Sequence, residues 1–340
     1  MRALVYEAPR TMNMRTIDPP VAGRGDVVLR VAYSGICGSE LSGFLGQNSL
    51  RTPPLVFGHE LSGWIEQVGE GVDSPDLAVG MPVTANPLVT CGRCEACVTG
   101  RQQLCPRRKL LGAHLPGCNA DLVVVPATSV LPLPAGMSME DAALVEPAAR
   151  AVHAVELSGA GPTSRALVLG AGPIGLFLIQ VLKAHGVAEI YAADLNGRRL
   201  GMAEAMGATP VVAGPDGLPA RIAAETGGRG VTVSFDAVGS ASTRLDCLTS
   251  TSPGGTMVLV GLHTDATALP MNSVIRSEVS LRGAFAYADL DFRTALDWLA
   301  EGRIGLDDGV VIAPLADGAD WYARLVDGDG AAKVLLDPRR

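Results

Sequence analysis

Val168-Leu-Gly-Ala-Gly-Pro-Ile-Gly175 is the stretch of sequence that decides the fold of this chain. It follows an apolar run of β-strand type, residues 166–169, and opens a helical pattern at residues 176–185. The first of its three glycines permits a tight turn, the second lets the backbone approach a pyrophosphate, and the third lets helix and strand pack closely. The helix N-terminus also attracts the anion. The stretch therefore predicts a dinucleotide-binding βαβ unit, with a glycine-rich turn that binds nothing as the alternative.

Asp194 follows the next strand-like run, residues 189–193. At this place a carboxylate accepts hydrogen bonds from the adenosine ribose hydroxyls and repels a 2′-phosphate. The sequence therefore predicts NAD as the cofactor. NADP stays open as the alternative, because Arg198 or Arg199 could place a guanidinium group beside a 2′-phosphate.

The pattern of the chain changes at Pro147. Before it, short strand-like runs are broken by Pro and Gly, and after it, strands alternate with helical patterns, which is βαβ order. Further strands are expected at residues 231–237, 257–260 and 279–282. They predict an α/β fold with a doubly wound parallel sheet. The last segment, with a helix near 292–301 and a strand at 333–336, is too small to fold alone and should pack onto an earlier part.

The composition indicates a packed globular protein. Of its 340 residues 48% are hydrophobic and 18% charged, which excludes a disordered chain, and the length suggests two domains. A net charge of −8 argues against nucleic acid or an anionic membrane surface as a partner, and indicates small molecules instead. The apolar stretches are too short to span a bilayer and the N-terminus has no secretory pattern, so a cytoplasmic protein is expected.

Four of the seven cysteines stand close together, at Cys91, Cys94, Cys97 and Cys105. This spacing lets four thiolates surround one tetrahedral ion and leaves no position open, so we expect a structural zinc. Basic residues in the same stretch would offset the negative charge of four thiolates. A zinc ribbon that binds nucleic acid and a set of free thiols are the alternatives.

A second group of metal-ligand type comes from two motifs, Cys37-Gly-Ser-Glu40 and Gly58-His-Glu60. In order along the chain, these motifs, the four cysteines and the glycine stretch resemble the zinc-dependent medium-chain dehydrogenase/reductase family over nearly the full length. Gly58-His-Glu60 with Val145-Glu-Pro147 and Asp194-x4-Arg199 is most similar to the polyol (sorbitol) and threonine dehydrogenase branch.

The resemblance implies a β-rich chaperonin-10-like (GroES-like) catalytic domain, discontinuous over residues 1–150 and 286–340, and an NAD-binding Rossmann domain at 151–285. It also implies the residues of the site. Cys37, His59 and Glu60 match catalytic zinc ligands, and Glu146 matches a fourth ligand or a holder of the zinc-bound water. Such a set neutralises Zn²⁺ and leaves a position open, so the ion can act as a Lewis acid on an alcohol or carbonyl oxygen.

Ser39 matches the hydroxyl that the family places beside the substrate oxygen, so we assign it to proton transfer, with a helix cap as its alternative role. Cofactor contacts carry over to Gly170, Gly172, Pro173, Ile174, Gly175, Asp194, Arg199, Val260, Gly261, Leu262, Ala284 and Phe285.

Two positions depart from the family pattern. Glu40 replaces the usual Asp that orients the zinc-bound imidazole, so that contact is expected to be longer or shifted. Ser42 replaces a His that ends the proton relay in many relatives, and His114 or His153 is left as a substitute. Cys118 and Cys247 match no motif and should pack as small apolar residues.

Together these features predict hydride transfer between NAD and a polar secondary alcohol (a polyol, a sugar-like compound or a cyclitol) or its ketone. Two zinc ions per subunit and a homodimer or homotetramer are expected. An aminocyclitol dehydrogenase, similar to 2-deoxy-scyllo-inosamine dehydrogenases, is one alternative. A protein that binds NAD and zinc without turnover is the other.

Overall fold

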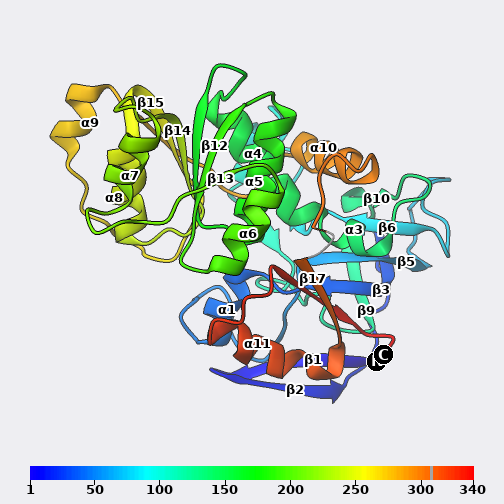
Figure 1. Cartoon of the computed structure of the whole chain (residues 1–340). Helices are drawn as coiled ribbons and strands as arrows, with labels where there is room; N and C mark the ends of the chain where they lie inside the picture. Colours follow the sequence, from blue (N-terminus) through cyan, green and yellow to red (C-terminus); the bar gives the residue numbers. More distant parts are fainter. Residues whose placement is uncertain (307–308) are drawn as a thin grey trace. The chain divides into compact units, whose positions relative to one another are not determined.

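The computed structural model describes residues 1–306 and 309–340. They form two compact units (Figure 1). The first unit consists of Met1–Glu146 and Ala288–Arg340, and the second of Pro147–Tyr287. The sequence placed the boundaries at residues 150 and 286.

The second unit is built on a six-stranded parallel sheet in the order β13-β12-β11-β14-β15-β16. Its strands are β11 (Arg165–Leu169), β12 (Glu189–Ala193), β13 (Thr209–Pro210), β14 (Val231–Asp236), β15 (Thr251–Leu259) and β16 (Ser280–Gly283). The strand order turns back on itself between β11 and β14, which is the switch point of a doubly wound sheet and the place where ligands bind in such sheets. The predicted parallel sheet is therefore confirmed.

Helices connect these strands. They are α4 (Val145–Ser158), which begins at the end of the first unit, α5 (Pro173–Ala184), α6 (Gly197–Ala205), α7 (Leu218–Glu225), α8 (Ala241–Ser250) and α9 (Met271–Ser277). The glycine stretch lies between β11 and α5, with Gly172 as the N-cap residue and Pro173 in the first turn, where a missing N–H costs nothing.

The strand expected at residues 257–260 begins earlier, at Thr251. Pro253, Gly254 and Gly255 are residue types that favour turns, but the structure accommodates them as an irregularity in the register between β14 and β15. A turn signal inside a strand concealed its first half.

The first unit is rich in β-strands, as predicted. Its strands are β1 (Arg2–Ala8), β2 (Thr11–Thr16), β3 (Asp26–Gly35), β4 (Leu55–Val56), β5 (Glu60–Val68), β6 (Pro82–Ala85), β7 (Leu88–Val89), β8 (Lys109–Leu110), β9 (Leu122–Pro126), β10 (Val130–Pro132), β17 (Val310–Pro314) and β18 (Lys333–Asp337). Its helices include α1 (Gly38–Phe44), α2 (Glu95–Val98), α3 (Met139–Ala143), α10 (Asp289–Ala300) and α11 (Gly318–Val326). The main sheet has the order β10-β6-β5-β3-β18-β17, with β9 also paired to β3.

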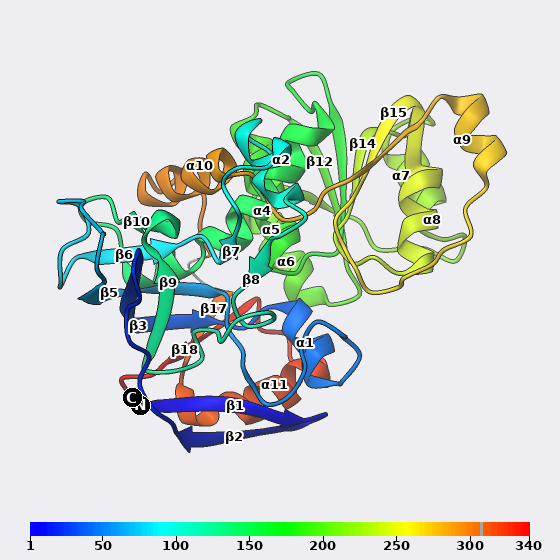
Figure 2. The ribbon, with the colours of Figure 1, turned by 180° about the vertical axis from the view of Figure 1, so that it is seen from behind.

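The end of the chain lies in the middle of this sheet. β18 pairs with β3 in antiparallel register, Leu335 opposite Gly35 and Leu336 opposite Ser34. In Figure 2 β18 lies next to β3, and α11 lies between α1 and β1. The last segment thus packs onto the N-terminal strands.

A core beside this sheet joins α1, β1 and α11 through aromatic rings. The rings of Tyr6 and Phe57 are 4.8 Å apart, and those of Phe44 and Tyr322 are 5.7 Å apart. All four side chains are buried. This packing fixes α11 under the strand ends that carry the predicted metal ligands. Among the helices of residues 1–306 and 309–340, none is both long and apolar enough to cross a bilayer.

Candidate active site

Two adjacent strands bring the predicted metal ligands together. β3 pairs with β5 in antiparallel register, so that Gly35 lies opposite Glu60. Cys37 follows the end of β3 and is the N-cap residue of α1, while His59 directly precedes β5. Motifs that are about twenty residues apart in the sequence therefore meet at one end of this strand pair.

The ligand atoms of Cys37, His59 and Glu60 all lie within 4.8 Å of one another. Cys37 is partly exposed, whereas His59 and Glu60 are buried. Glu146, in the first turn of α4, is buried as well, and its Oε2 has no hydrogen-bond partner among the described residues. Thiolate, imidazole and carboxylate are the donor types that Zn²⁺ takes in catalytic sites, so these residues fit the metal that the sequence predicts.

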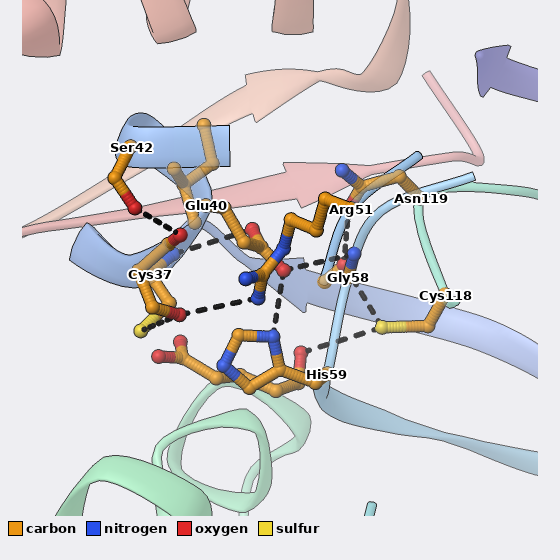
Figure 3. A network of polar contacts seen from close by, with 12 residues as sticks. Cys37, Glu40, Ser42, Arg51, Gly58, His59, Cys118 and Asn119 are labelled. Carbon is orange, nitrogen blue, oxygen red and sulfur yellow. Dashed lines mark hydrogen bonds and ion pairs between the residues drawn. The ribbon is translucent and has the colours of Figure 1, made fainter. Parts of the chain in front are cut away.

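The structure anchors His59 through Glu40 (Figure 3). Oε1 of Glu40 lies 2.7 Å from Nδ1 of His59 and accepts a hydrogen bond from the amide of Gly58 at 2.9 Å. The expectation of a longer contact is wrong: Glu40 lies inside α1, and its extra methylene carries the carboxylate to the imidazole. Burial would raise the pKa of Glu40, but His59 and Arg51 together lower it to about 2. Glu40 is therefore a carboxylate that fixes the imidazole orientation.

Tyr322 of α11 holds the other oxygen of Glu40. The sequence did not identify it as a residue of the site. Its hydroxyl donates to Oε2 of Glu40 at 2.6 Å and accepts from Nδ2 of Asn119 at 3.0 Å. Ser34 in turn donates to Oδ1 of Asn119 at 2.6 Å. These side chains are buried, so the ligand His59 rests on a hydrogen-bonded chain that passes through Tyr322 of α11 and ends at Ser34 of β3.

Lys333 is a second residue that the sequence analysis missed. It is 2% exposed, forms an ion pair with Oε2 of Glu60, and donates to the carbonyl of Ile36 at 2.9 Å. The charges of Glu60, Cys37 and Glu146 outweigh burial and raise the pKa of Lys333. A lone lysine at the start of a fully buried strand was the available signal, since such a charge is rarely buried without a partner.

Ser39 lies in the first turn of α1, where its hydroxyl donates to Sγ of Cys37 at 3.4 Å. The alternative role as a helix cap is wrong, because Cys37 occupies the N-cap position. Arg51 donates from Nη2 to Oγ of Ser39 at 3.2 Å. Thus a hydroxyl and a guanidinium group, the latter again missed in the sequence, stand beside the metal-ligand cluster.

The residues proposed as substitutes for the relay His lie on other elements than Ser42. Ser42, at the relay position, donates to the carbonyl of Ser39 inside α1. His114 accepts a hydrogen bond from the amide of Leu110 in its own loop at 3.1 Å, and His153 lies on α4 in the second unit. Cys118 and Cys247 are buried, as expected, although Cys118 lies 3.1 Å from the Ser34 hydroxyl.

The four cysteines of the second cluster lie in the loop between β7 and β8. Their sulfur atoms all lie within 4.8 Å of one another, with Cys94 and Cys97 3.5 Å apart. Arg107 donates to Sγ of Cys91 at 3.1 Å, so a basic residue of this stretch does offset thiolate charge. Backbone amides, first that of Arg93, lower the pKa of Cys91 to about 5. Four sulfur donors at these distances fit one tetrahedral zinc.

The cofactor residues expected from the sequence lie at the carboxyl ends of parallel strands in the second unit. Gly170 has a positive φ of 98° and packs against Val238, which follows β14, and a side chain on Gly175 would collide with the carbonyl of Gly170. Asp194, directly after β12, accepts hydrogen bonds from the amides of Ala171 at 2.7 Å and Asn196 at 2.8 Å. The acid is thus fixed beside the glycine stretch.

The remaining cofactor residues follow β15 and β16 or lie on α6. The amides of Val260 and Gly261 donate to the carbonyl of Asp236, and that of Ala284 donates to the carbonyl of Leu259. Leu262 and Phe285 are exposed, and Arg199 is partly buried on α6. All of these residues lie at the carboxyl end of the sheet, as the switch point does.

Comparison with known proteins identifies both halves of the chain. Residues 23–135 match the alcohol dehydrogenase GroES-like domain, and residues 173–301 match the zinc-binding dehydrogenase family. Sorbitol dehydrogenase of Bacillus subtilis is 33% identical, covering 89% of this chain and 87% of that protein. D-Arabitol-phosphate dehydrogenase of Enterococcus avium is 32% identical, covering 99% and 97%.

A solved structure described as a short chain alcohol dehydrogenase from E. coli CFT073, complexed with cofactor NADH, superimposes with a TM-score of 0.92. It is 30% identical, with 99% of each chain covered. These findings confirm the predicted GroES-like and Rossmann fold and do not favour a binding protein without turnover. At these identities over nearly the whole length, the chain belongs to the zinc-dependent alcohol dehydrogenases of the medium-chain dehydrogenase/reductase family.

Proposed function

We propose that the protein transfers hydride between NAD and a polar secondary alcohol (a polyol, a sugar-like compound or a cyclitol) or its ketone. The observation that carries this proposal is the cluster of Cys37, His59 and Glu60, whose ligand atoms lie within 4.8 Å of one another. Named relatives include dehydrogenases of sorbitol and of D-arabitol phosphate, which supports a polyhydroxy substrate.

In this proposal Cys37, His59 and Glu60 hold the catalytic zinc, with Glu146 as a fourth ligand or an acceptor for water. When bound, the zinc supplies Lewis acidity toward the substrate oxygen, and NAD accepts or gives the hydride. Ser39, whose hydroxyl is 3.4 Å from Sγ of Cys37, is the group that exchanges the alcohol proton. Glu40 keeps the imidazole of His59 oriented toward the metal.

We further propose that Cys91, Cys94, Cys97 and Cys105 hold a second, structural zinc, which makes two per subunit. Such a cluster needs reduced thiols, and the seven cysteines are free in the structure, so we place the protein in the reducing cytoplasm.

The preference for NAD rests on Asp194. Its carboxylate is held by two backbone amides at the end of β12, where a 2′-phosphate would meet a fixed negative charge. The proposed cofactor residues are those at the carboxyl end of this sheet. They are Gly170, Gly172, Pro173, Ile174, Gly175, Asp194, Arg199, Val260, Gly261, Leu262, Ala284 and Phe285.

We also propose that copies of the chain associate through β16. This strand is the edge of its sheet, and α9 next to it has no buried residue. Met271 and Ile275 on α9 are 53% and 70% exposed. An open strand edge beside an apolar helix face is a surface that another copy can cover.

The test combines elemental analysis with turnover. We expect two zinc ions per subunit, one for each cluster, and NADH formation with members of a panel of alditols, cyclitols and simple alcohols. Cys37→Ser should lose one zinc and all turnover while the fold persists. A protein with one zinc and no NADH formation would contradict the proposed catalytic site.

A further inference from the structure

Arg51 carries a buried positive charge that the protein itself does not pair. The side chain is 4% exposed, yet Nε has no hydrogen-bond partner, and the described residues place no carboxylate within ion-pair distance of the guanidinium group. Its one side-chain hydrogen bond there is from Nη2 to Oγ of Ser39. A buried charge without a partner is costly, so such a group persists in a folded protein when something else completes it.

Glu40, a carboxylate whose pKa the charge of Arg51 lowers, is already engaged. Its Oε1 accepts from Gly58 and lies against His59 (Figure 3). Its Oε2 accepts from Tyr322. The field of Arg51 nevertheless reaches its surroundings: after burial and the charge of Arg108, the charge of Arg51 contributes to the lowered pKa of His114. The guanidinium group therefore retains positive potential that no side chain in the described part of the chain neutralises directly.

The position of this charge relates it to the substrate. The stem of Arg51 packs against Gly43 of α1 and its guanidinium group lies by the ring of Phe57, with 5.6 Å between Cζ and the ring centre. The hydrogen bond to Ser39 places the group two contacts away from Sγ of Cys37. Ser39 and Cys37 are both partly exposed, so a molecule that contacts the Ser39 hydroxyl lies one hydrogen bond away from Arg51.

We propose that Arg51 binds an anionic group of the substrate, so that the alcohol is a polyhydroxy carboxylate or a phosphate ester of a polyol. A guanidinium group presents paired N–H donors that match a carboxylate or a phosphate. A neutral polyol leaves this charge unpaired, and an aminocyclitol adds a second cation beside it. The inference rests on the proposed function, and it narrows the substrate class of the same site.

The experiment compares substrates that share one carbon skeleton and differ in charge. D-Gluconate, sorbitol 6-phosphate, sorbitol and glucamine, with the corresponding five-carbon series, are offered to the zinc-loaded protein with NAD, and kcat/KM is measured for each. We expect an anionic member to be the best substrate and the amines the worst. The carboxylate and phosphate arms decide which anion is bound.

The variant Arg51→Gln should lower the ratio of kcat/KM for the anionic to the neutral alcohol by about 10- to 100-fold, the loss expected for a hydrogen bond to a charged group. Arg24→Gln is the matched control, because Arg24 is an exposed arginine of the same unit. It removes the same net charge and should leave the ratio unchanged. Arg51→Lys keeps the charge without the planar fork and should give a smaller fall, and it carries the test if Arg51→Gln does not fold.

Two results would overturn the inference in different ways. In the first, neutral alditols are oxidised as well as anionic ones, and the ratio of kcat/KM for anionic to neutral alcohol is the same in both Arg51 variants as in the wild type. Arg51 then does not recognise the substrate, while the proposed function stands. If the zinc-loaded protein oxidises no alcohol of any charge, the proposed function fails, and the inference fails with it.

Discussion

The buried phenol of Tyr322 supports the site through one hydrogen bond, which it donates to Glu40. Tyr322→Phe removes the hydrogen bond to Glu40 and leaves Nδ2 of Asn119 without its acceptor, so we expect a loss of about 1–3 kcal/mol in the free energy of unfolding. Because Glu40 then holds His59 less firmly, zinc affinity should fall by about 10-fold or more. Zinc release to a chromogenic chelator and thermal unfolding measure the two effects.

Tyr6→Phe is the control for this prediction. Tyr6 is buried in the same aromatic core, 4.8 Å from the ring of Phe57, but the described residues give its hydroxyl no hydrogen bond. This variant should retain zinc as the wild type does. Equal zinc loss from both variants would show that the core, and not the hydrogen bond to Glu40, holds the site.

The ion pair between Lys333 and Glu60 should stabilise the metal-free protein. Lys333→Met leaves the carboxylates of Glu60 and Glu146 buried without their cation, which should cost about 3–5 kcal/mol of unfolding free energy. Adding Glu60→Gln should recover part of this loss, because the stranded charge is then gone. Chemical denaturation of the two single variants and the double variant measures the coupling, and strictly additive effects would contradict it.

Among the elements, we expect the loop with four cysteines to depend on the zinc proposed for it. Its regular structure consists of β7, β8, α2 and a single 3₁₀ turn, Gln102–Leu104, which are too short to hold a loop by themselves. Cys94→Ser should therefore remove one zinc, lower the melting temperature and open this loop to proteases, whereas Cys37→Ser should remove the other zinc and leave the melting temperature close to that of the wild type. Equal unfolding in both variants would contradict the division into structural and catalytic sites.

The way the elements come together also explains which site residues the sequence could predict and which it could not. The glycine stretch, the four cysteines and the two ligand motifs are contiguous, so their patterns survive in the sequence, and the pairing of β3 with β5 brings the ligand motifs together. Arg51, Tyr322 and Lys333 belong to no local pattern. Lys333 donates to a carbonyl 297 positions earlier, and Tyr322 to a carboxylate 282 positions earlier. Such contacts arise because β18 pairs with β3 and α11 packs beside α1, an arrangement that no single stretch encodes.

At the scale of the whole molecule, the exposed surface of β16 and α9 predicts the oligomeric state. Replacing Met271 and Ile275 together by Glu places charges on the face that a second copy would cover. We expect the mass measured by light scattering to fall to that of a monomer, 35.0 kDa, whereas wild type stays at a multiple of it. An unchanged mass would show that copies associate elsewhere or not at all.

The central place of β18 has a consequence for how the protein matures. During synthesis Tyr322, which holds Glu40, and Lys333, which holds Glu60, follow the four cysteines at 91–105 by more than two hundred residues. We therefore expect the nascent chain to be able to bind the proposed structural zinc while it is still being made. The proposed catalytic site can be complete only once β18 has been made and has paired with β3, so we expect a chain truncated before Lys333 to lack a finished active site.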